Sequence, residues 1–236
     1  MALDIYIGSL TRYYAGSWET ISQKRDREAG IPSEATREPG EDAIRDPDEI
    51  RPLVVEWRQG IATALEESIV DPFDWDESSD APYSTDQVGR AAFDSLRLWA
   101  AYAEHPDLQR PTELAGELAA DPAFLRCNDP EGTSIYHQVV RDIEVWLPWD
   151  FGFVFRAATP AGGKVGLGSV PALRKQLAEL NSKTWRASSE ATLASWRKEA
   201  PSPDAPLEVQ ARFAYGVLYP LAALAEKRRS LLKLEE

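Results

Sequence analysis

The sequence predicts an α+β fold that is mainly helical, with one small sheet in a single domain spanning residues 1–236. Two observations predict this class. Apolar residues recur at helical spacing over several long segments, whereas only the first ten residues and a late hairpin alternate as strands do. The 236 residues, of which 43% are hydrophobic, suffice for one sizeable core or two small ones. We therefore expect helices packed around a sheet made of the N-terminal strand and the hairpin.

The first third of the chain is predicted to alternate between ordered elements and acidic loops. Residues 3–10 alternate as a strand does, and residues 18–29 form a short polar helix. Residues 48–70 carry an apolar stripe at helical spacing behind an Asp cap. The segments 30–47 and 71–84, on either side of that helix, are rich in charge and contain prolines, which predicts loops.

The middle of the chain is expected to be helical, with one ambiguous segment. A long helix is predicted over 85–105 behind a Ser-Thr cap, and short helices over 111–120 and 121–127. The segment 135–147 has apolar residues at helical spacing, but its β-branched content suits a strand. Both interpretations of that segment stay open.

A strand and a hairpin are predicted next. Phe151, Phe153 and Phe155 alternate with other residues, as on one face of a strand. A Pro-Ala-Gly-Gly turn follows, and residues 164–168 are expected to pair back on the strand before it.

The C-terminal part is predicted to be helical throughout. Ser169 is placed to cap a helix with an apolar stripe over 170–180, and another helix covers 188–199. The Pro-rich segment 200–206 is a linker to a long final helix. Basic residues between 227 and 233 lie where a helix dipole favours cations, so this helix is expected to continue to the end of the chain.

The negative charge is concentrated in one segment. Of the formal charge of -13, -11 lies between residues 34 and 80, where 15 Asp and Glu face four Arg and no Lys. Nucleic acids and anionic membrane surfaces require basic partners, so a pI near 4.7 argues against both. Such a local electrostatic field fits a basic protein or peptide, or a cationic ligand; the alternative is an acidic surface that only aids solubility.

The second acidic loop combines carboxylates with aromatic residues. Carboxylates steer a basic partner and aromatic rings anchor it, so this loop is the predicted partner-binding site. The alternative is a solvated loop with one or two rings packed into the core. The candidate residues are Asp74, Trp75, Asp76, Glu77 and Asp80.

The most distinctive segment of the sequence is the N-terminal block at residues 3–14, which reads Leu-Asp-Ile-Tyr-Ile-Gly-Ser-Leu-Thr-Arg-Tyr-Tyr. Over about the first 20 residues it resembles the opening of an uncharacterised family of bacterial proteins, and the resemblance implies no activity. Carboxylates and tyrosines can do acid–base chemistry without histidine, so this block supports an alternative hypothesis of a ligand or catalytic pocket beside the first strand. That pocket would use Asp4, Tyr6, Arg12, Tyr14 and Glu19.

Few residues suit other chemistries. His105 is expected at a helix end and His137 in the core, and neither belongs to a metal-ligand motif. Cys127, the single cysteine, excludes an intramolecular disulfide and is expected to be a small buried side chain. Residues 74–85 alternate like a calcium loop but lack its central glycine and final glutamate. We predict no catalytic residue, no cofactor and no metal site.

These observations favour a non-enzymatic, acidic protein-binding protein, such as an immunity-type inhibitor of a basic bacterial toxin. A small-ligand-binding protein or an enzyme with the carboxylate and tyrosine pocket is the alternative. An acidic mimic of nucleic acid ranks last, because the carboxylates fall mostly in Pro-rich loops. No signal peptide or membrane span is evident in the sequence, so a cytoplasmic location is expected.

Overall fold

A computed structural model describes residues 2–31, 46–65, 74–114, 116–129 and 132–235. Within these residues the strands are β1 (Ala2–Gly8), β2 (Ser84–Gly89), β3 (Val145–Leu147), β4 (Phe155–Ala158), β5 (Lys164–Ser169) and β6 (Leu231–Glu235). The helices are α1 (Leu10–Tyr14), α2 (Ile21–Glu28), α3 (Pro47–Leu65), α4 (Arg90–Glu104), α5 (Pro122–Cys127), α6 (His137–Val140), α7 (Val170–Lys183), α8 (Glu190–Arg197) and α9 (Leu207–Arg228), with a short 3-10 helix η1 (Leu118–Ala120). The fold is therefore α+β, as predicted.

The six described strands form one mixed sheet in the order β2-β1-β6-β3-β5-β4. β1 is antiparallel to β2 and β6, β6 is antiparallel to β3, and β5 is parallel to β3 but antiparallel to β4. Strands from the two ends of the chain thus lie side by side, with Ile5 opposite Leu234. The sheet is larger than the small one that the sequence predicts.

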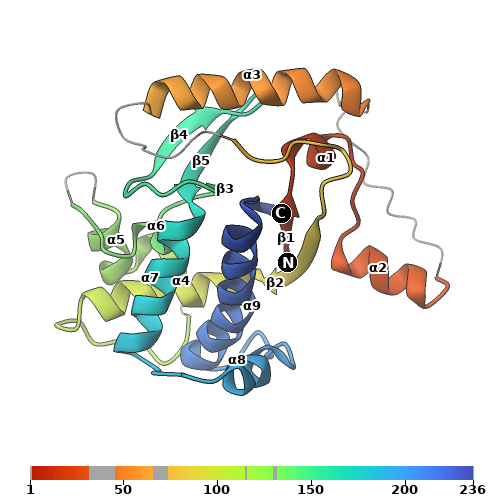
Figure 1. The fold of residues 1–236 in the computed structure, drawn as a ribbon. Coiled ribbons are helices and arrows are strands. Elements are labelled where there is room, and N and C mark those ends of the chain that lie inside the picture. Colours follow the sequence, from red (N-terminus) through yellow and green to blue (C-terminus); the bar gives the residue numbers. More distant parts are fainter. Residues whose placement is uncertain (1, 32–45, 66–73, 115, 130–131, 236) are drawn as a thin grey trace.

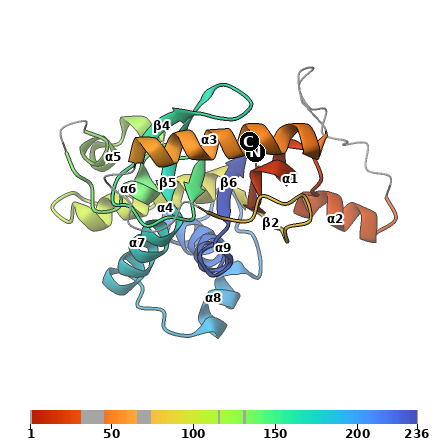
Figure 2. The same cartoon turned by 45° about the horizontal axis from the view of Figure 1, so that its top comes forward.

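Helices cover both faces of the sheet (Figures 1 and 2). Leu3, Ile5 and Ile7 of β1 are buried in one core together with residues of α4, α7 and α9. Tyr6 is buried in a second core, on the face that α3 covers. Successive side chains of a strand point to opposite faces, so β1 contributes to both cores.

The start of the predicted helix 85–105 is wrong, because residues 84–89 form strand β2. Thr85 pairs with Tyr6 and Val88 with Leu3 along the edge of β1. Gly89 is the N-cap of α4, which begins only at Arg90. Residues 85–89 fit a helical stripe and a strand about equally well, and the unpaired edge of β1 decides between them.

The C-terminal strand β6 replaces the expected end of the last helix. Arg229 adopts a left-handed conformation with φ 50°, and the Ser230 amide donates to the Ala225 carbonyl at 2.9 Å. This is the bond pattern that commonly ends a helix, although glycine usually occupies the left-handed position. The sequence therefore carries no stop signal before Leu231.

The segment 135–147, for which both a helix and a strand were open, contains one of each: helix α6 is followed by strand β3. The predicted strand of three phenylalanines is wrong for its first half: β4 begins only at Phe155. Phe151 lies before the strand and is buried, and its ring centroid is 5.1 Å from that of Phe153. Mutual packing of the rings, not strand pairing, places these residues.

Several other predicted elements agree with the structure, but the helix predicted over 111–120 is wrong: among its described residues only Leu118–Ala120 are helical, as the 3-10 helix η1. The hairpin pairs β4 with β5, Ser169 caps α7 through the Ala172 amide, and α9 follows the irregular residues 200–206. Helix α2 begins at Ile21 behind Thr20, three residues later than predicted. Most of the predicted loop 30–47 and the end of the predicted helix 48–70 lie outside the described residues. Among the described helices, none has the length and apolar composition needed to cross a membrane.

Candidate functional site

The acidic loop that precedes β2 buries every second side chain at its start. Asp74 and Asp76 are exposed, whereas Trp75 and Glu77 retain 5% and 4% of their surface. Asp80 is exposed as well. The five predicted partner-binding residues therefore divide into three surface carboxylates and two buried side chains that a docked partner would not touch.

Trp75 and Glu77 hold this loop against the rest of the protein. The ring centroids of Trp75 and Trp149 lie 4.7 Å apart. The Glu77 carboxylate accepts hydrogen bonds from the backbone amides of Leu10 and Thr11, at 3.2 and 2.8 Å. It also accepts one from the indole N–H of Trp75. Glu77 is thus a buried acceptor that joins the loop to α1.

The position of Glu77 has two opposing effects on the pKa of its carboxyl group. The first amides of a helix have no carbonyl partner within the helix, and the positive end of the helix dipole favours an anion there. Burial nevertheless raises the pKa of Glu77, and the hydrogen bonds from Thr11, Trp75 and Leu10 oppose that rise. The carboxylate completes α1 rather than facing solvent.

The backbone of the loop is also bonded to α1. The Ser9 hydroxyl, which accepts from the Arg12 amide as the N-cap, lies 3.1 Å from the carbonyl of Ser78 and donates to it. Arg12 Nε donates to the Ser79 carbonyl at 2.8 Å. Side chains and backbone together fix the loop, so its exposed carboxylates project from a well-supported position.

Helix α3 adds further carboxylates beside this loop. Arg58 of α3 pairs with Asp74 at 2.9 Å and donates to the Trp75 carbonyl at 2.9 Å. A hydrogen bond from the Ser78 amide is the main cause that lowers the pKa of Asp76. We use the name acidic surface for the exposed carboxylates on α3, on the residue before it and on the loop. They are Asp46, Asp48, Glu49, Glu56, Asp74, Asp76 and Asp80.

Tyr6, the centre of the predicted pocket, is fully buried. Its ring centroid lies 5.0, 5.4 and 6.2 Å from those of Trp18, Tyr13 and Tyr83. Its hydroxyl donates to the Ser9 carbonyl at 2.8 Å. Burial raises its pKa well above the ordinary value. Tyr6 therefore serves as the core of an aromatic cluster and presents no surface to a ligand.

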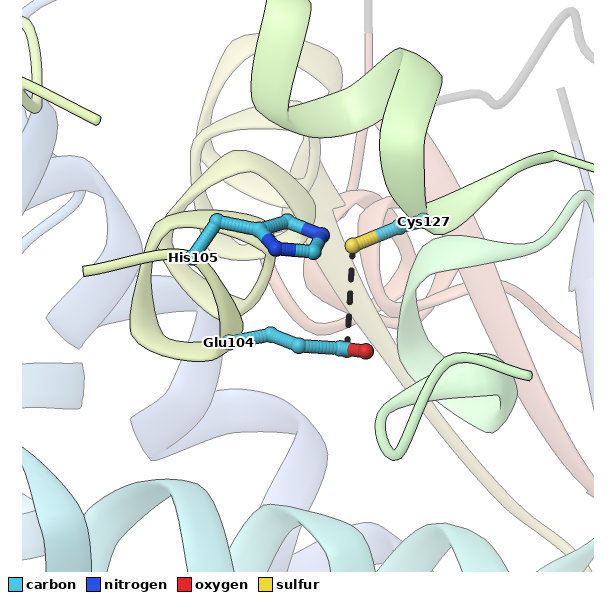
Figure 3. Close-up of side chains that lie close together, drawn as sticks. All are labelled: Glu104, His105 and Cys127. Carbon is cyan, nitrogen blue, oxygen red and sulfur yellow. Dashed lines mark hydrogen bonds between the residues drawn. The ribbon is translucent and has the colours of Figure 1, made fainter. Parts of the chain in front are cut away.

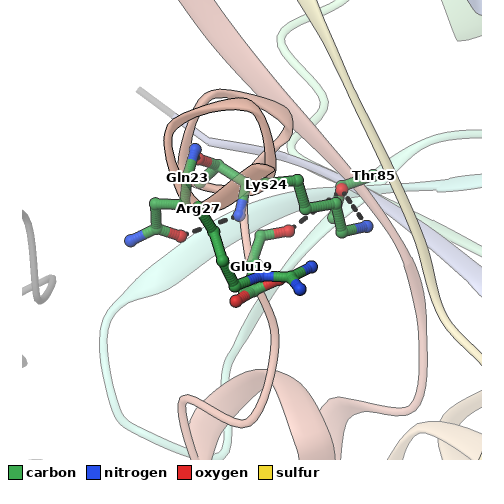
Figure 4. Close-up of polar contacts among 6 residues, drawn as sticks. Glu19, Gln23, Lys24, Arg27 and Thr85 are labelled. Carbon is green, nitrogen blue, oxygen red and sulfur yellow. Dashed lines mark hydrogen bonds and ion pairs between the residues drawn. The ribbon is translucent and has the colours of Figure 1, made fainter. Parts of the chain in front are cut away.

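Glu19 takes part in a polar network that fastens α2 to β2 (Figure 4). Its carboxylate pairs with Arg27 at 3.0 Å, and its carbonyl accepts from the Thr85 hydroxyl at 3.0 Å. Lys24 Nζ donates to the same hydroxyl at 2.9 Å. These contacts give Glu19 a structural role at the edge of the sheet.

The other predicted pocket residues are spread around the same region. Asp4 accepts a hydrogen bond from a β2 side chain at 3.3 Å. Burial raises the pKa of Tyr14. The guanidinium of Arg12 lies 5.0 Å from the ring centroid of Tyr83, which also contacts Tyr6. The structure thus brings Arg12 and Tyr6 together through Tyr83, whereas Asp4 and Glu19 make separate contacts to β2.

A cavity of about 510 Å³ opens beside β1, where Leu3 forms part of its wall. Its walls include basic and acidic side chains together with apolar ones, and none of the five predicted pocket residues contributes. The lining residues are Leu3, Arg90, Phe93, Arg97, Asp142, Ile143, Glu144, Lys233, Leu234 and Glu235.

Three chemically different side chains form a separate cluster that no sequence pattern predicts (Figure 3). Glu104, His105 and Cys127 place a carboxylate oxygen, an imidazole nitrogen and a sulfur within 4.8 Å of one another. The first two residues are adjacent in the sequence, but the third belongs to another helix. No spacing motif joins these residues, so only the packing of α4 against α5 brings them together.

No protein-family model, curated protein or solved structure matches the chain.

Proposed function

We propose that the protein binds a basic protein through the acidic surface. The observation that carries this proposal is the concentration of seven exposed carboxylates on α3, its preceding residue and the adjoining loop. The surface stays negative in total although Arg51 of α3 is exposed near Asp76, and such a surface steers a partner of opposite charge and raises the rate of association. The loop needs little ordering on binding, because its backbone is already bonded to α1.

The kind of protein that we infer is an immunity-type inhibitor that neutralises a basic bacterial toxin. Such an inhibitor needs no catalytic group and binds by complementary charge. Trp75 is not one of its anchors in this proposal, because it packs against Trp149. Exposed carboxylates would therefore determine the rate of association, and residues beside them would determine the rate of dissociation.

A ligand pocket formed by the tyrosines of the N-terminal block is the less favoured proposal. Tyr6 has no exposed surface, and Glu19 is held by Arg27 and Thr85. A ligand could reach Tyr6 only by opening the aromatic cluster, and it would compete with Arg27 for the Glu19 carboxylate. The carboxylates of the acidic surface are already exposed, and the contact that a partner would compete with there is the ion pair of Asp74 with Arg58.

The test compares two variants with the same change in net charge. Asp74→Lys, Asp80→Lys and Asp76→Asn alter the acidic surface; asparagine at 76 keeps the oxygen that accepts from Ser78. The matched control is Glu190→Lys, Asp204→Lys and Glu199→Gln, at exposed positions around α8. A partner captured from lysate with the unaltered protein would be purified, and its association rate measured over a range of salt concentrations.

We expect the first variant to slow association by about tenfold or more at low salt, and to remove most of its salt dependence. The control should change the rate much less. Equal rates for the unaltered protein and the first variant would contradict the proposal, as would a purified partner that is acidic.

A further inference from the structure

Glu104, His105 and Cys127 lie where two helices end. Glu104 is the last residue of α4, His105 caps that helix, and Cys127 is the last residue of α5. Their ligand atoms are within 4.8 Å of one another. Figure 3 shows the imidazole ring pointing toward the Cys127 sulfur, with the Glu104 carboxylate beside both. Oxygen, nitrogen and sulfur donors thus converge on one point.

The spacing of these donors suits a tetrahedral ion. With bonds of about 2.3 Å to sulfur and about 2.1 Å to oxygen, a tetrahedral zinc ion holds the two atoms about 3.6 Å apart. The Cys127 Sγ to Glu104 Oε2 distance is 3.7 Å. The other pairs of ligand atoms are within 4.8 Å, so a bound ion would draw them closer together.

The imidazole provides an independent indication. His105 Nε2 is buried and has no hydrogen-bond partner among the described residues. A buried polar nitrogen without a partner loses its hydration without compensation. Ligation of a metal ion would satisfy this atom, since neutral imidazole is a common ligand of zinc.

The carboxylate is supported as metal ligands usually are. The Ser134 hydroxyl donates to Glu104 Oε2 at 2.6 Å, and the Ile135 amide donates to Oε1 at 3.3 Å. Hydrogen bonds of this kind orient a ligand and keep it in place. They also connect the cluster to the segment that leads into α6.

We propose that Glu104, His105 and Cys127 bind a divalent transition metal ion, with zinc as the favoured ion. Three protein ligands leave a fourth position for water or another ligand. Glu104 and His105 are partly exposed, so the ion enters from their side, while Cys127 is only 1% exposed. A bound ion would tie the end of α4 to the end of α5.

A nucleophilic cysteine assisted by His105 is the competing use of these residues. Nucleophilic cysteines have a lowered pKa. Such cysteines are also accessible and lie in electropositive surroundings, whereas Cys127 is only 1% exposed and its thiol donates to the Glu104 carboxylate at 3.7 Å. A metal ion displaces that proton to the buffer and takes the thiolate as its ligand.

The experiment uses the full chain, stripped of metal, and titrates it with cobalt(II) and then zinc(II). We expect one equivalent of cobalt to give the ligand-field absorption of a tetrahedral ion and a thiolate-to-cobalt charge-transfer band. Zinc should displace the cobalt. Calorimetry in buffers of different ionisation enthalpy should find about one proton released per zinc bound near pH 7.

Three conservative variants identify the ligands. Cys127→Ser, Glu104→Gln and His105→Asn should each weaken zinc binding at least tenfold, and Cys127→Ser should abolish the charge-transfer band. Matched controls are His137→Gln, which removes the other imidazole of the chain, and Asp107→Asn, which removes a nearby exposed carboxylate paired with Arg126. Circular dichroism shows which variants are folded, and Cys127→Ala replaces Cys127→Ser if serine prevents folding.

Failure to take up cobalt or zinc at micromolar concentration would overturn the proposal. So would uptake that persists without Cys127, or binding that the control variants weaken as much as the ligand variants do. Rapid alkylation of the thiol at pH 7 in the metal-free protein would favour the nucleophilic use instead. None of these results depends on whether a basic partner binds the acidic surface.

Discussion

Glu77 is buried and Glu104 is partly exposed, and the groups around the two carboxylates differ in chemical type. Glu77 receives hydrogen bonds from the Leu10 and Thr11 amides and from the Trp75 indole. All of these donors are N–H groups, and none of them binds metal ions. The first carboxylate therefore completes a helix and can do little else.

Glu104 receives bonds from a hydroxyl and an amide, but it also adjoins a thiol and an imidazole. Removal of an acidic group from solvent therefore does not indicate its function. The chemical type of the surrounding atoms separates a structural cap from a ligand. Removal of each carboxylate should therefore have different consequences for stability and for metal response.

The largest effect is expected for Glu77→Ala. This change leaves three N–H donors without an acceptor, each at a cost of about 1–3 kcal/mol, so the free energy of unfolding should fall by about 3 kcal/mol or more. Urea denaturation followed by circular dichroism measures it. Asp80→Ala, at an exposed position in the same loop, is the control and should stay within about 0.5 kcal/mol. Equal effects of the two changes would contradict the structural assignment of Glu77.

A smaller effect is expected for Glu104→Ala in metal-free protein. The Ser134 hydroxyl and the Ile135 amide lose their acceptor, but the site is partly exposed, so a loss of about 1–2 kcal/mol is expected. Zinc should raise the melting temperature of the unaltered protein and have little effect on this variant. If zinc raised the melting temperature of Glu104→Ala as much as that of the unaltered protein, Glu104 would not be a zinc ligand and would be a structural acceptor like Glu77.

The smallest expected effect is the pH dependence that Glu77 gives to the stability of the protein. Its pKa in the folded protein is raised above the ordinary value of 4.5. The folded state therefore keeps the proton where the unfolded state has lost it, so this group stabilises the fold at low pH. That contribution is lost as the pH rises from about 4.5 through the raised pKa.

Glu77→Gln cannot ionise, so it isolates this contribution. The stability of the unaltered protein relative to this variant should decrease as the pH is raised from 4 to 8. Urea unfolding at several pH values measures the difference. A relative stability that increases with pH would mean that the amide donors outweigh burial and that the pKa of Glu77 is lowered.

The N-terminal strand, the hairpin and several helices could be predicted because their signals are local. Ser169 caps its helix as its position suggests, and the alternation of β1 is visible in the sequence. β6 could not be predicted in this way, since its helix ends at a left-handed Arg229 rather than at glycine. β2 was missed because its strand character depends on the neighbouring edge of β1.

The same distinction between local signals and contacts of distant residues applies to the candidate sites. Composition and local periodicity are enough to establish the concentration of acidic charge, the scarcity of histidine and cysteine, and the α+β class. The burial of Glu77 at the start of α1 and the contact of Cys127 with Glu104 and His105 are visible only in the folded protein. Burial and ligand convergence arise from contacts between residues far apart in the chain, and local sequence patterns do not encode those distances.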